Sequence, residues 1–514
     1  MPRPLAAYAD MSLMPGVCGV PAGALLSPFN WTATWNMDCS TLDGAGTPLC
    51  YRNDEDVDND AEPWQELEHI ITHLWMLPSS HVRRVRDAER AEVVIVPSAL
   101  AHCRHPLGWK RHAWWNPAMV DGRVDVHDAY WSALQQRDAL RAAARAARNQ
   151  TREQVMLIHY DGTWQMDYGL AMLGALARQP ASFVRRLIIA SIEDPLQVEV
   201  HARRFAAPHA SPTFVSVPFA ILVRDVVHAA PLAAVATRAA RDARPIALLF
   251  TGRPHGSFDG SRQAVYEQLR RMGALCVHGH DGRVSCALCA PPRASDGCRD
   301  AFDALRLQRY HDPSAFGALK VLGLASRSVF CIEPTSDTLV RSHTYAAMLA
   351  GCVPVLFDTE LPFGEVRARH VTEWAWRVGP SHAPILNYSR FAVVDAAMPF
   401  VRGERAGLLP SLVRLASDPV ERPRLHALQR RLACEAAPLM RYAAPAEARA
   451  RGGGRRRDWC TAAPAATPES ALDAASGARD AFGMLVLTVQ AVARGGGRGA
   501  GGGGRRSSRW GSAP

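Results

Sequence analysis

Short apolar runs alternate with longer amphipathic stretches along the first half of the chain. Buried strands are predicted where the apolar runs are bounded by polar or turn-forming residues, at residues 91–97, 154–159, 186–191 and 213–217. Helices are predicted at residues 64–77 and 129–148, where the stretches are long and, in the first, apolar residues recur at helical spacing. Strands that alternate with helices in this way are typical of a parallel sheet covered on both faces.

The same pattern restarts in the second half. Residues 229–244 are rich in alanine and charge and predict a linker or a linking helix. The elements predicted after it are a strand at 245–250, a turn at 251–256, a helix at 260–272, a strand at 328–332, a helix ending at Ala350 and a strand at 353–357. The chain therefore predicts two successive α/β units.

These patterns divide the chain into four parts. Residues 1–30 are rich in proline and glycine and carry no clear element, residues 31–230 form the first α/β domain, and residues 245–445 form the second. Residues 446–514 form a tail whose Gly/Arg-rich segments, 451–457 and 495–506, have too little complexity to build a core. We expect these two segments to be disordered.

The positive charge of the chain gathers in this tail. Of the formal net charge of +10, the 11 arginines and 5 acidic residues of 446–514 contribute +6, which leaves +4 for the other 445 residues. That is too dilute for a face that neutralises many phosphates. A nucleic-acid-binding protein that acts through the arginine-rich tail is therefore a minor alternative.

The 12 cysteines leave three possibilities open. Cys276, Cys286, Cys289 and Cys298 lie close together, which fits disulfides formed in an oxidising lumen. The Cys286-Ala-Leu-Cys289 spacing also fits half of a zinc site, and free thiols are the third possibility.

Targeting signals are weak. Sequons at Asn30, Asn149 and Asn387 give slight support for a secretory route, whereas no apolar run is long enough to span a bilayer and residues 13–26 make a poor signal peptide. We interpret Asp54-Glu-Asp56 as a solvated acidic loop rather than a metal–nucleotide site.

The stretch 328–357 carries the most chemistry. It predicts a strand that ends at Pro334, a polar loop, a helix and a second strand, with Gly351 closing the helix. Side-chain oxygens for the start of the helix come from Ser336, Asp337 and Thr338, with Arg341 in the first turn. Free amides beside an arginine at the carboxyl end of a strand suit a diphosphate. From these residues alone, an ordinary structural βαβ unit is the alternative.

The stretch also resembles a known family. Phe-Cys-Ile-Glu-Pro-x-x-Asp-Thr-x-x-Arg at 330–341, followed by Ala-Gly-Cys-Val-Pro-Val at 350–355, is similar to the donor-site signature of the exostosin family of inverting glycosyltransferases (family 47). Further similarity covers residues 88–97, Thr251-Gly252 with Arg262, and 361–363. The resemblance extends over about 60–420; it is strong at 245–365 and weak elsewhere.

The resemblance implies a GT-B arrangement, in which two Rossmann-like domains face a cleft. It further implies a nucleotide-sugar donor, expected to be a UDP-sugar, on the C-terminal domain and a glycan or polysaccharide acceptor on the N-terminal one. No metal or other cofactor is expected, and the implied location is the Golgi lumen or membrane, with a possible homo- or hetero-oligomer of related transferases. Which sugar is moved is not readable from the sequence.

The chain departs from the family pattern at two positions. Ser336 replaces a glycine, and Ala346 replaces an acidic residue that many members place near the nucleotide ribose; Glu333 or His343 could compensate. The residues expected to bind the donor are Arg253, Glu333, Ser336, Asp337, Thr338, Arg341 and His343. The loss at Ala346 favours the main alternative, a non-catalytic partner subunit or carbohydrate-binding scaffold of the same fold.

An inverting transfer needs a base for the acceptor hydroxyl and positive charge on the leaving diphosphate. We expect Arg341 and the helix start near Thr338 to stabilise the leaving group, with Arg253 next. His159 and Asp161, which follow a buried strand of the N-terminal domain, are the candidates for the catalytic base, although such residues can also merely cap a loop. Glu193 and Asp194, after the next strand, are held in reserve.

Overall fold

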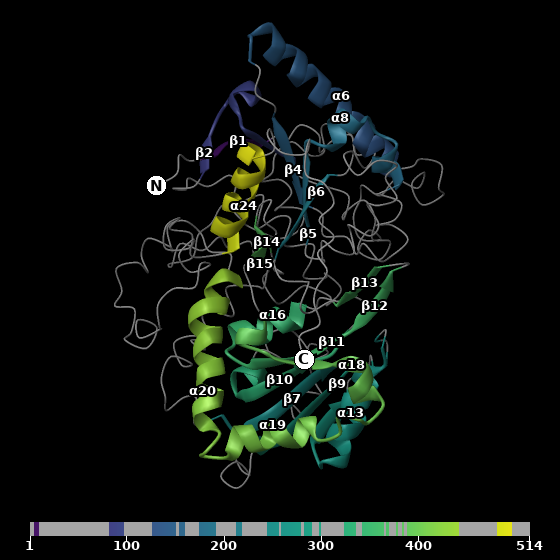
Figure 1. Cartoon of the computed structure of the whole chain (residues 1–514), viewed down its shortest axis with the longest axis vertical. Coiled ribbons are helices and arrows are strands. Elements are labelled where there is room, and N and C mark those ends of the chain that lie inside the picture. Colours follow the sequence, from purple (N-terminus) through teal and green to yellow (C-terminus); the bar gives the residue numbers. More distant parts are fainter. Residues whose placement is uncertain are drawn as a thin grey trace, which may run out of the picture.

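The computed structural model contains two six-stranded sheets, which lie at opposite ends of the long axis of the molecule (Figure 1). The residues that it describes are 5–9, 82–96, 126–150, 154–159, 174–191, 212–217, 244–255, 257, 259–278, 282–289, 298–299, 323–335, 342–363, 366–369, 377–378, 383–384, 388–440 and 481–495. The predicted α/β class with two Rossmann-like units is confirmed. The predicted helix at 64–77 lies outside the described residues.

The N-terminal sheet is parallel throughout and has the order β2-β1-β3-β4-β5-β6. Its strands are β1 (Leu5–Ala9), β2 (Val82–Arg84), β3 (Val93–Val96), β4 (Val155–His159), β5 (Leu187–Ser191) and β6 (Thr213–Ser216). Its described helices are η2 (Ala88–Arg90), α6 (Val126–Ala147) and α8 (Ala181–Val184). Strands β3 to β6 and helix α6 confirm the sequence predictions.

Strand β1 is an element that the sequence did not predict. Residues 1–30 were uninformative, yet Leu5–Ala9 lies between β2 and β3 and pairs with both, and its first three side chains are buried. The sequence Leu-Ala-Ala-Tyr-Ala lacks β-branched residues, so its local signal for a strand is weak. Pairing with neighbours distant in sequence decides its conformation, and the N-terminal unit therefore includes residue 5.

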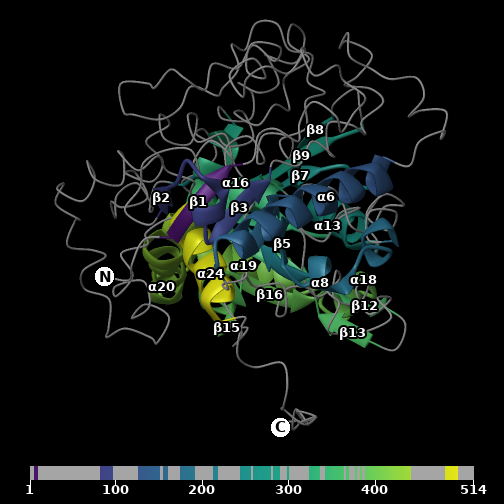
Figure 2. The same cartoon turned by 90° about the horizontal axis from the view of Figure 1, so that it is seen from above.

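Helix α6 packs on the N-terminal sheet through a mixed face, and it lies across that sheet when the molecule is seen from above (Figure 2). Trp131 and Leu134 are fully buried. Asp138, also buried, pairs with Arg186 at the start of β5. Burial raises the pKa of Asp138 above its ordinary value, although the charges of Arg186 and Arg141 act in the opposite direction.

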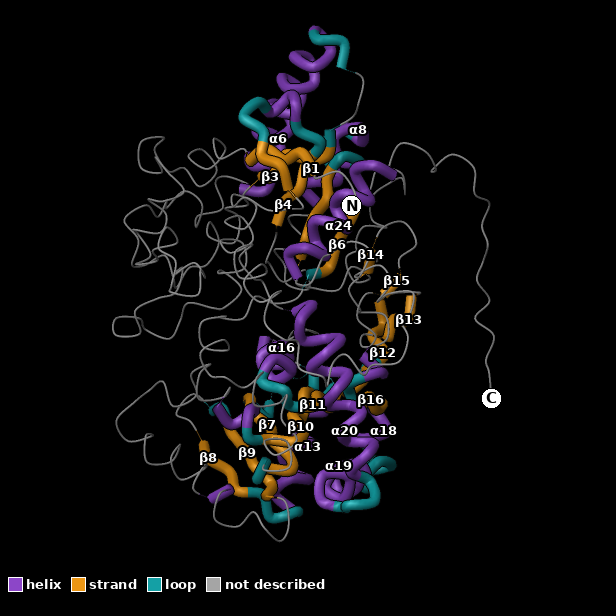
Figure 3. Tube along the Cα trace, turned by 90° about the vertical axis from the view of Figure 1, so that its left-hand side faces the viewer, coloured by secondary structure: helices purple, strands orange, loops and turns teal. Residues whose placement is uncertain are grey.

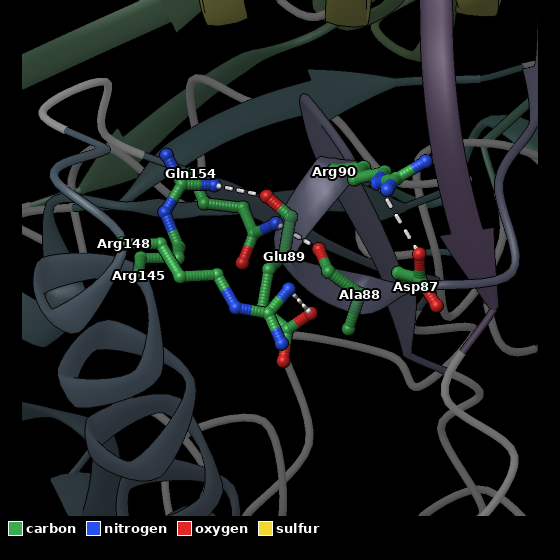
Figure 4. A network of polar contacts seen from close by, with 7 residues as sticks. All are labelled: Asp87, Ala88, Glu89, Arg90, Arg145, Arg148 and Gln154. Carbon is green, nitrogen blue, oxygen red and sulfur yellow. Dashed lines mark hydrogen bonds and ion pairs between the residues drawn. The ribbon is translucent and has the colours of Figure 1, made fainter.

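A polar network holds the end of α6 against the amino ends of β3 and β4 (Figure 4). The buried amide of Gln154 donates to the carbonyl oxygens of Ala88 and of Ala91, the latter at 2.9 Å. Arg145 donates to the carbonyl oxygen of Glu89 at 3.2 Å, and Arg148 pairs with the Glu89 carboxylate at 3.0 Å. We call these residues the amino-edge network.

The C-terminal sheet has the order β16-β11-β10-β7-β9-β8 and is parallel except at β9. Its strands are β7 (Ile246–Gly252), β8 (Leu275–His278), β9 (Val284–Cys289), β10 (Ser328–Glu333), β11 (Val353–Asp358) and β16 (Val393–Ala396). Its helical segments are α13 (Ser261–Arg271), α16 (Ser342–Leu349), η5 (Tyr388–Arg390), α18 (Ala397–Val401), α19 (Leu408–Ser417), α20 (Arg422–Arg431), η6 (Leu432–Ala436) and η7 (Ala437–Met440). Strands β7, β10 and β11 and helices α13 and α16 confirm the sequence predictions.

Helix α16 ends where the sequence predicts. Gly351 has φ of 74°, in the left-handed region that a glycine adopts without strain. Its N–H donates to the carbonyl oxygen of Met348 at 3.0 Å, and the N–H of Cys352 donates to that of Ala347 at 2.9 Å, which is a Schellman motif. The chain therefore leaves α16 in the direction needed to enter β11.

Arg244 anchors the amino ends of the same sheet. Its buried guanidinium donates to the carbonyl oxygens of Ser328 and of Ala350, the latter at 3.1 Å. The arginine falls in the segment that the sequence predicted to be a linker. It joins the entry of β7 to the entry of β10 and to the end of α16, so this part of the linker is structural.

The described cysteines form disulfides. The pairs formed between described residues are Cys276–Cys286, Cys289–Cys298 and Cys331–Cys352, and Cys434 is disulfide-bonded as well. Cys286 and Cys289 lie on β9 three residues apart, so their side chains point to opposite faces of the strand, whereas a zinc site needs them together. The disulfide prediction is confirmed for these cysteines, and the zinc alternative is wrong.

The predicted tail contains a structured helix. Helix α24 (Ala481–Gly495) buries Met484, Leu485, Val486 and Val489 in the same apolar cluster that runs through both sheets. Its last turn reaches the N-terminal sheet, where Arg494 pairs with the buried Glu92 at 3.3 Å. A helix with one apolar face in an otherwise Gly/Arg-rich segment is stabilised by this packing, so 446–514 is not a tail throughout.

Two hairpins lie between the sheets. In the side view of Figure 3, β12 (Glu360–Phe363) with β13 (Val366–Arg369), and β14 (Arg377–Val378) with β15 (Ala383–Pro384), follow one another along one side of the molecule. Strand β14 contacts both β6 and α24, and α24 also contacts η7. The C-terminal half is thus packed against the N-terminal half by these elements. Among the residues that the structure describes, no helix has the length and apolarity that a bilayer crossing requires.

Candidate functional site

The strand order of the C-terminal sheet marks one position for a ligand. From β7 the chain passes through α13 to β8 on one side, whereas β10, on the other side of β7, continues through α16 to β11. The direction of winding therefore reverses between β7 and β10. In open α/β sheets, ligands bind outside the carboxyl ends of the strands at such a point. The described residues that follow β7, β10 and β11, together with the first turn of α16, are the candidate site, which we call the carboxyl-edge site.

Side-chain hydrogen bonds join these three segments. The Asp259 carboxylate, just before α13, accepts the N–H of Ser261 at 2.9 Å and the hydroxyl of Thr359, which follows β11. The hydroxyl of Ser261 lies 3.5 Å from that of Thr335, which follows β10. Ser261, Thr335 and Thr359 are buried, so the network fixes the ends of three strands relative to one another.

The same bonds set the charge of Asp259. Burial alone pushes its pKa up, but the hydrogen bonds from Ser261, Thr359 and Thr335 stabilise the ionised form and outweigh burial. The net pKa lies below the ordinary value of 3.8. Asp259 is therefore an anion at neutral pH, with its oxygens engaged by neighbouring donors.

A second pair joins β10 to α16. Glu333, the last residue of β10, has a fully buried side chain, and its Oε1 lies 2.6 Å from Nδ1 of His343 in the first turn of α16. Thr344 donates its hydroxyl to the other oxygen of Glu333 at 3.3 Å. Nε2 of His343 is buried and has no hydrogen-bond partner in the part of the chain that the structure describes. A buried polar atom without a partner costs ~1–3 kcal/mol, so it calls for an explanation.

The structure brings together two of the residues predicted to bind a donor and places a third at the same edge of the sheet. Glu333 and His343 are in contact, and Arg253 is exposed directly after β7, at the same edge of the sheet. Ala346, where an acidic residue was expected from the family resemblance, is half-buried on α16 and packs against the core. Four other residues predicted to bind the donor lie outside the described residues: Ser336, Asp337, Thr338 and Arg341.

The predicted catalytic base stays a prediction. His159 is the last residue of β4, so its backbone lies at the carboxyl edge of the N-terminal sheet, but its side chain is outside the described residues. Asp161, Glu193, Asp194 and the Asp54–Asp56 loop also lie outside them.

Sequence reasoning missed the Asp259 cluster. Asp259-Gly-Ser261 precedes a predicted helix, and an aspartate followed by glycine is a recognisable signal of a turn before a helix start. Thr335 lies inside the stretch already singled out, and Thr359 directly follows β11. Their contacts depend on strands that are adjacent in the sheet and distant in sequence, so spacing alone could not reveal them.

The carboxyl-edge site offers hydroxyls, a buried histidine–carboxylate pair and an exposed arginine. This set can bind a polar ligand that carries both hydroxyl groups and negative charge. Within the described parts of the chain, no group of three or more histidine, cysteine or acidic side chains is placed to hold a metal ion.

Comparison with known proteins gives short matches. No family model matches the chain. A segment of 50 residues is 45% identical to "Probable xyloglucan galactosyltransferase GT17" and one of 49 residues is 37% identical to "Probable xyloglucan galactosyltransferase GT13", both from Arabidopsis thaliana. Each match spans 10% of this chain and 10% of the relative's length.

A solved structure matches over a larger part of the chain. It is that of a sucrose-phosphate synthase from Thermosynechococcus elongatus, with a TM-score of 0.32 and 10% sequence identity over 87% of this chain and 98% of the other. A TM-score this low does not establish a detailed correspondence, so the fold rests on the strand order of the two sheets. The likeness to the two probable xyloglucan galactosyltransferases covers about 50 residues of the chain in each case.

Proposed function

We propose that the chain is a glycosyltransferase that binds a nucleotide-sugar donor at the carboxyl-edge site. The observation that carries this proposal is the position of the buried Glu333–His343 pair, at the point where the winding of the C-terminal sheet reverses. The short likeness to galactosyltransferases supports it. We infer that the donor is a UDP-sugar and that the acceptor is a glycan or polysaccharide, as the exostosin resemblance implies.

The proposed reaction is an inverting transfer. The acceptor hydroxyl attacks the anomeric carbon from the face opposite the diphosphate, the carbon–oxygen bond to the diphosphate breaks, and a base takes the hydroxyl proton. We assign the base to His159 or Asp161 and the stabilisation of the leaving diphosphate to Arg341, Thr338 and Arg253. These cationic and hydrogen-bonding groups belong to the chain, so the proposal requires no metal.

The disulfides bear on where the protein works. Three disulfides among the described residues fit maturation in an oxidising compartment. Asn149, in one of the sequons, is exposed at the end of α6. We therefore propose the Golgi lumen or membrane as the location, and a complex with a related transferase as a possible assembly.

A second candidate function is a non-catalytic partner subunit of the same fold. The observation in its favour is Ala346, whose methyl group packs against the core and offers no hydrogen bond to a nucleotide. Such a subunit would bind a donor weakly or not at all, so affinity for the donor separates the two functions.

The test is a donor screen with the full chain. A panel of UDP-sugars is added, and thermal shift, affinity and nucleotide release are recorded with and without chelator. One donor is expected to stabilise the protein in chelator too, and Arg341→Ala is expected to weaken its binding by about 10- to 100-fold, the effect of one charged hydrogen bond. The matched control is Arg424→Ala, since Arg424 is 75% exposed on α20. If a folded sample binds no donor on the panel, the non-catalytic subunit is the better assignment.

A further inference from the structure

The Glu333–His343 pair fixes which nitrogen of the imidazole carries a proton. Glu333 accepts hydrogen bonds from Nδ1 of His343 at 2.6 Å and from the hydroxyl of Thr344 at 3.3 Å. An ionised carboxylate can only accept, so Nδ1 carries the proton and donates it. When the ring carries this one proton, Nε2 has a lone pair and acts as an acceptor.

The acceptor lone pair on Nε2 is left without a donor. This atom is buried, and the described residues supply it with no hydrogen-bond partner. The side chain of His343 is only 13% exposed, so bulk water satisfies it poorly. Its place, in the first turn of α16 beside the end of β10, belongs to the carboxyl-edge site. A ligand bound there is the natural source of the missing donor.

An acceptor at Nε2 restricts which chemical group of a ligand can contact it. Phosphate oxygens of a nucleotide sugar accept hydrogen bonds and repel the lone pair of Nε2, whereas hydroxyl groups donate to it. We propose that Nε2 of His343 accepts a hydrogen bond from a hydroxyl of a sugar ring of the donor, and that Glu333 is a positioning residue that holds the imidazole in the accepting tautomer. This inference rests on the proposed function. The ring is either the ribose or the transferred sugar.

Two substitutions of His343 separate the role of each nitrogen. The amide of asparagine reaches the position of Nδ1, so His343→Asn keeps the contact with Glu333 and loses the atom at Nε2. The amide of glutamine reaches the position of Nε2, so His343→Gln keeps an acceptor for the ligand. His343→Asn is expected to weaken UDP-sugar affinity about tenfold, the effect of one hydrogen bond, with the thermal midpoint unchanged. His343→Gln is expected to stay within about threefold of wild type.

The positioning role of Glu333 is tested by comparing Glu333→Gln, which keeps an acceptor for Nδ1 of His343, with Glu333→Ala, which removes it. Glu333→Gln can still accept from Nδ1 and is expected to bind the donor within about threefold of wild type. Glu333→Ala releases the ring and is expected to lose affinity about as much as His343→Asn. If Glu333→Gln and Glu333→Ala lose affinity equally, and only in proportion to a loss of stability, Glu333 has a structural role and the proposed positioning is wrong.

The source of the hydroxyl is resolved by two further ligands, UDP and 2′-deoxy-UDP. If the ribose supplies it, His343→Asn weakens UDP itself, and removal of the 2′-hydroxyl affects wild type but not the variant. If the transferred sugar supplies it, the variant binds UDP as wild type does and loses affinity for the UDP-sugar alone. Either result supports the inference.

Three results overturn the inference, and only the last of them also overturns the proposed function. If wild type binds a UDP-sugar and His343→Asn binds it equally well, the histidine contact is wrong while the proposed function stands. If His343→Asn is too unstable to measure, His343→Gln provides the test. Weak UDP-sugar binding by a stable His343→Gln contradicts the inference, because glutamine keeps an acceptor at the position of Nε2. If wild type binds no nucleotide sugar at all, the proposed function fails and the inference fails with it.

Discussion

The N-terminal sheet carries a polar network at the amino ends of its strands, whereas the C-terminal sheet carries one at the carboxyl ends. In the amino-edge network of the N-terminal sheet, the buried amide of Gln154 donates to two backbone carbonyl oxygens. Arg145 donates to the carbonyl oxygen of Glu89, and Arg148 pairs with the carboxylate of Glu89. The carboxyl-edge site of the C-terminal sheet also contains buried polar groups, but it leaves Nε2 of His343 without a partner among the described residues. Networks with all their groups satisfied are typical of structural roles, whereas an unsatisfied buried group needs an explanation such as a functional role.

From this difference we expect the amino-edge network to stabilise the fold and the carboxyl-edge site to bind a ligand. Substitutions in the amino-edge network should change stability and leave ligand affinity alone. Substitutions at the carboxyl-edge site should change affinity, alone or together with stability.

The largest effect is expected from the disulfide that frames α16. Cys331 and Cys352 lie 21 residues apart, and the loop that they close contains Glu333, His343 and all of α16. Replacing both cysteines with alanine is expected to lower the free energy of unfolding by ~3 kcal/mol and to weaken donor binding, because the loop gains freedom. Urea unfolding and calorimetric titration measure the two effects. The Cys276/Cys286 double alanine variant is the control, expected to lose stability and retain affinity.

A smaller loss is expected from Gln154→Leu. The substitution keeps the side-chain volume and removes both hydrogen bonds to Ala88 and Ala91, which lowers the free energy of unfolding by ~1–3 kcal/mol. Donor affinity should not change. Gln150→Leu, at an exposed position close by, serves as the control. A loss of donor affinity in Gln154→Leu, at a temperature where the variant is fully folded, would break the contrast between the two edges.

The smallest effect is expected from Asp259→Asn, and it depends on pH. Because the folded pKa of Asp259 lies below its ordinary value of 3.8, the carboxylate contributes stability above that value and loses it as pH falls through the folded pKa. Asparagine should lower the free energy of unfolding by ~1 kcal/mol at pH 7, and the gap should close below about pH 4. Urea unfolding of both proteins across this range measures the gap. A gap that stays constant with pH contradicts the role of the charge.

The elements with strong periodic patterns could be predicted from the sequence. Strands β3, β7, β10 and β11 are apolar runs with clear boundaries, and Gly351 stands where α16 must end. Strand β1 and helix α24 could not be predicted in the same way. Leu5–Ala9 has little strand propensity of its own, and Ala481–Gly495 lies between Gly/Arg-rich segments, so both owe their structure to distant partners.

The candidate site was predicted in part. Glu333 and His343 were singled out because they stand in the donor-site stretch, and the structure places them 2.6 Å apart. Asp259 and Thr359 come from segments far apart in the chain, and only the sheet order brings them together. Cys286 and Cys289 show the converse, because their spacing fitted zinc until the strand placed them on opposite faces.

The central claim is that a nucleotide sugar binds at the carboxyl edge of the C-terminal sheet, and hydrogen–deuterium exchange of the full chain with and without a UDP-sugar tests it most directly. Slower exchange is expected in peptides that cover residues 251–262 and 328–349, with no change in those that cover 82–96 and 145–159. Protection confined to the N-terminal peptides, or no protection anywhere at saturating ligand, would contradict the account.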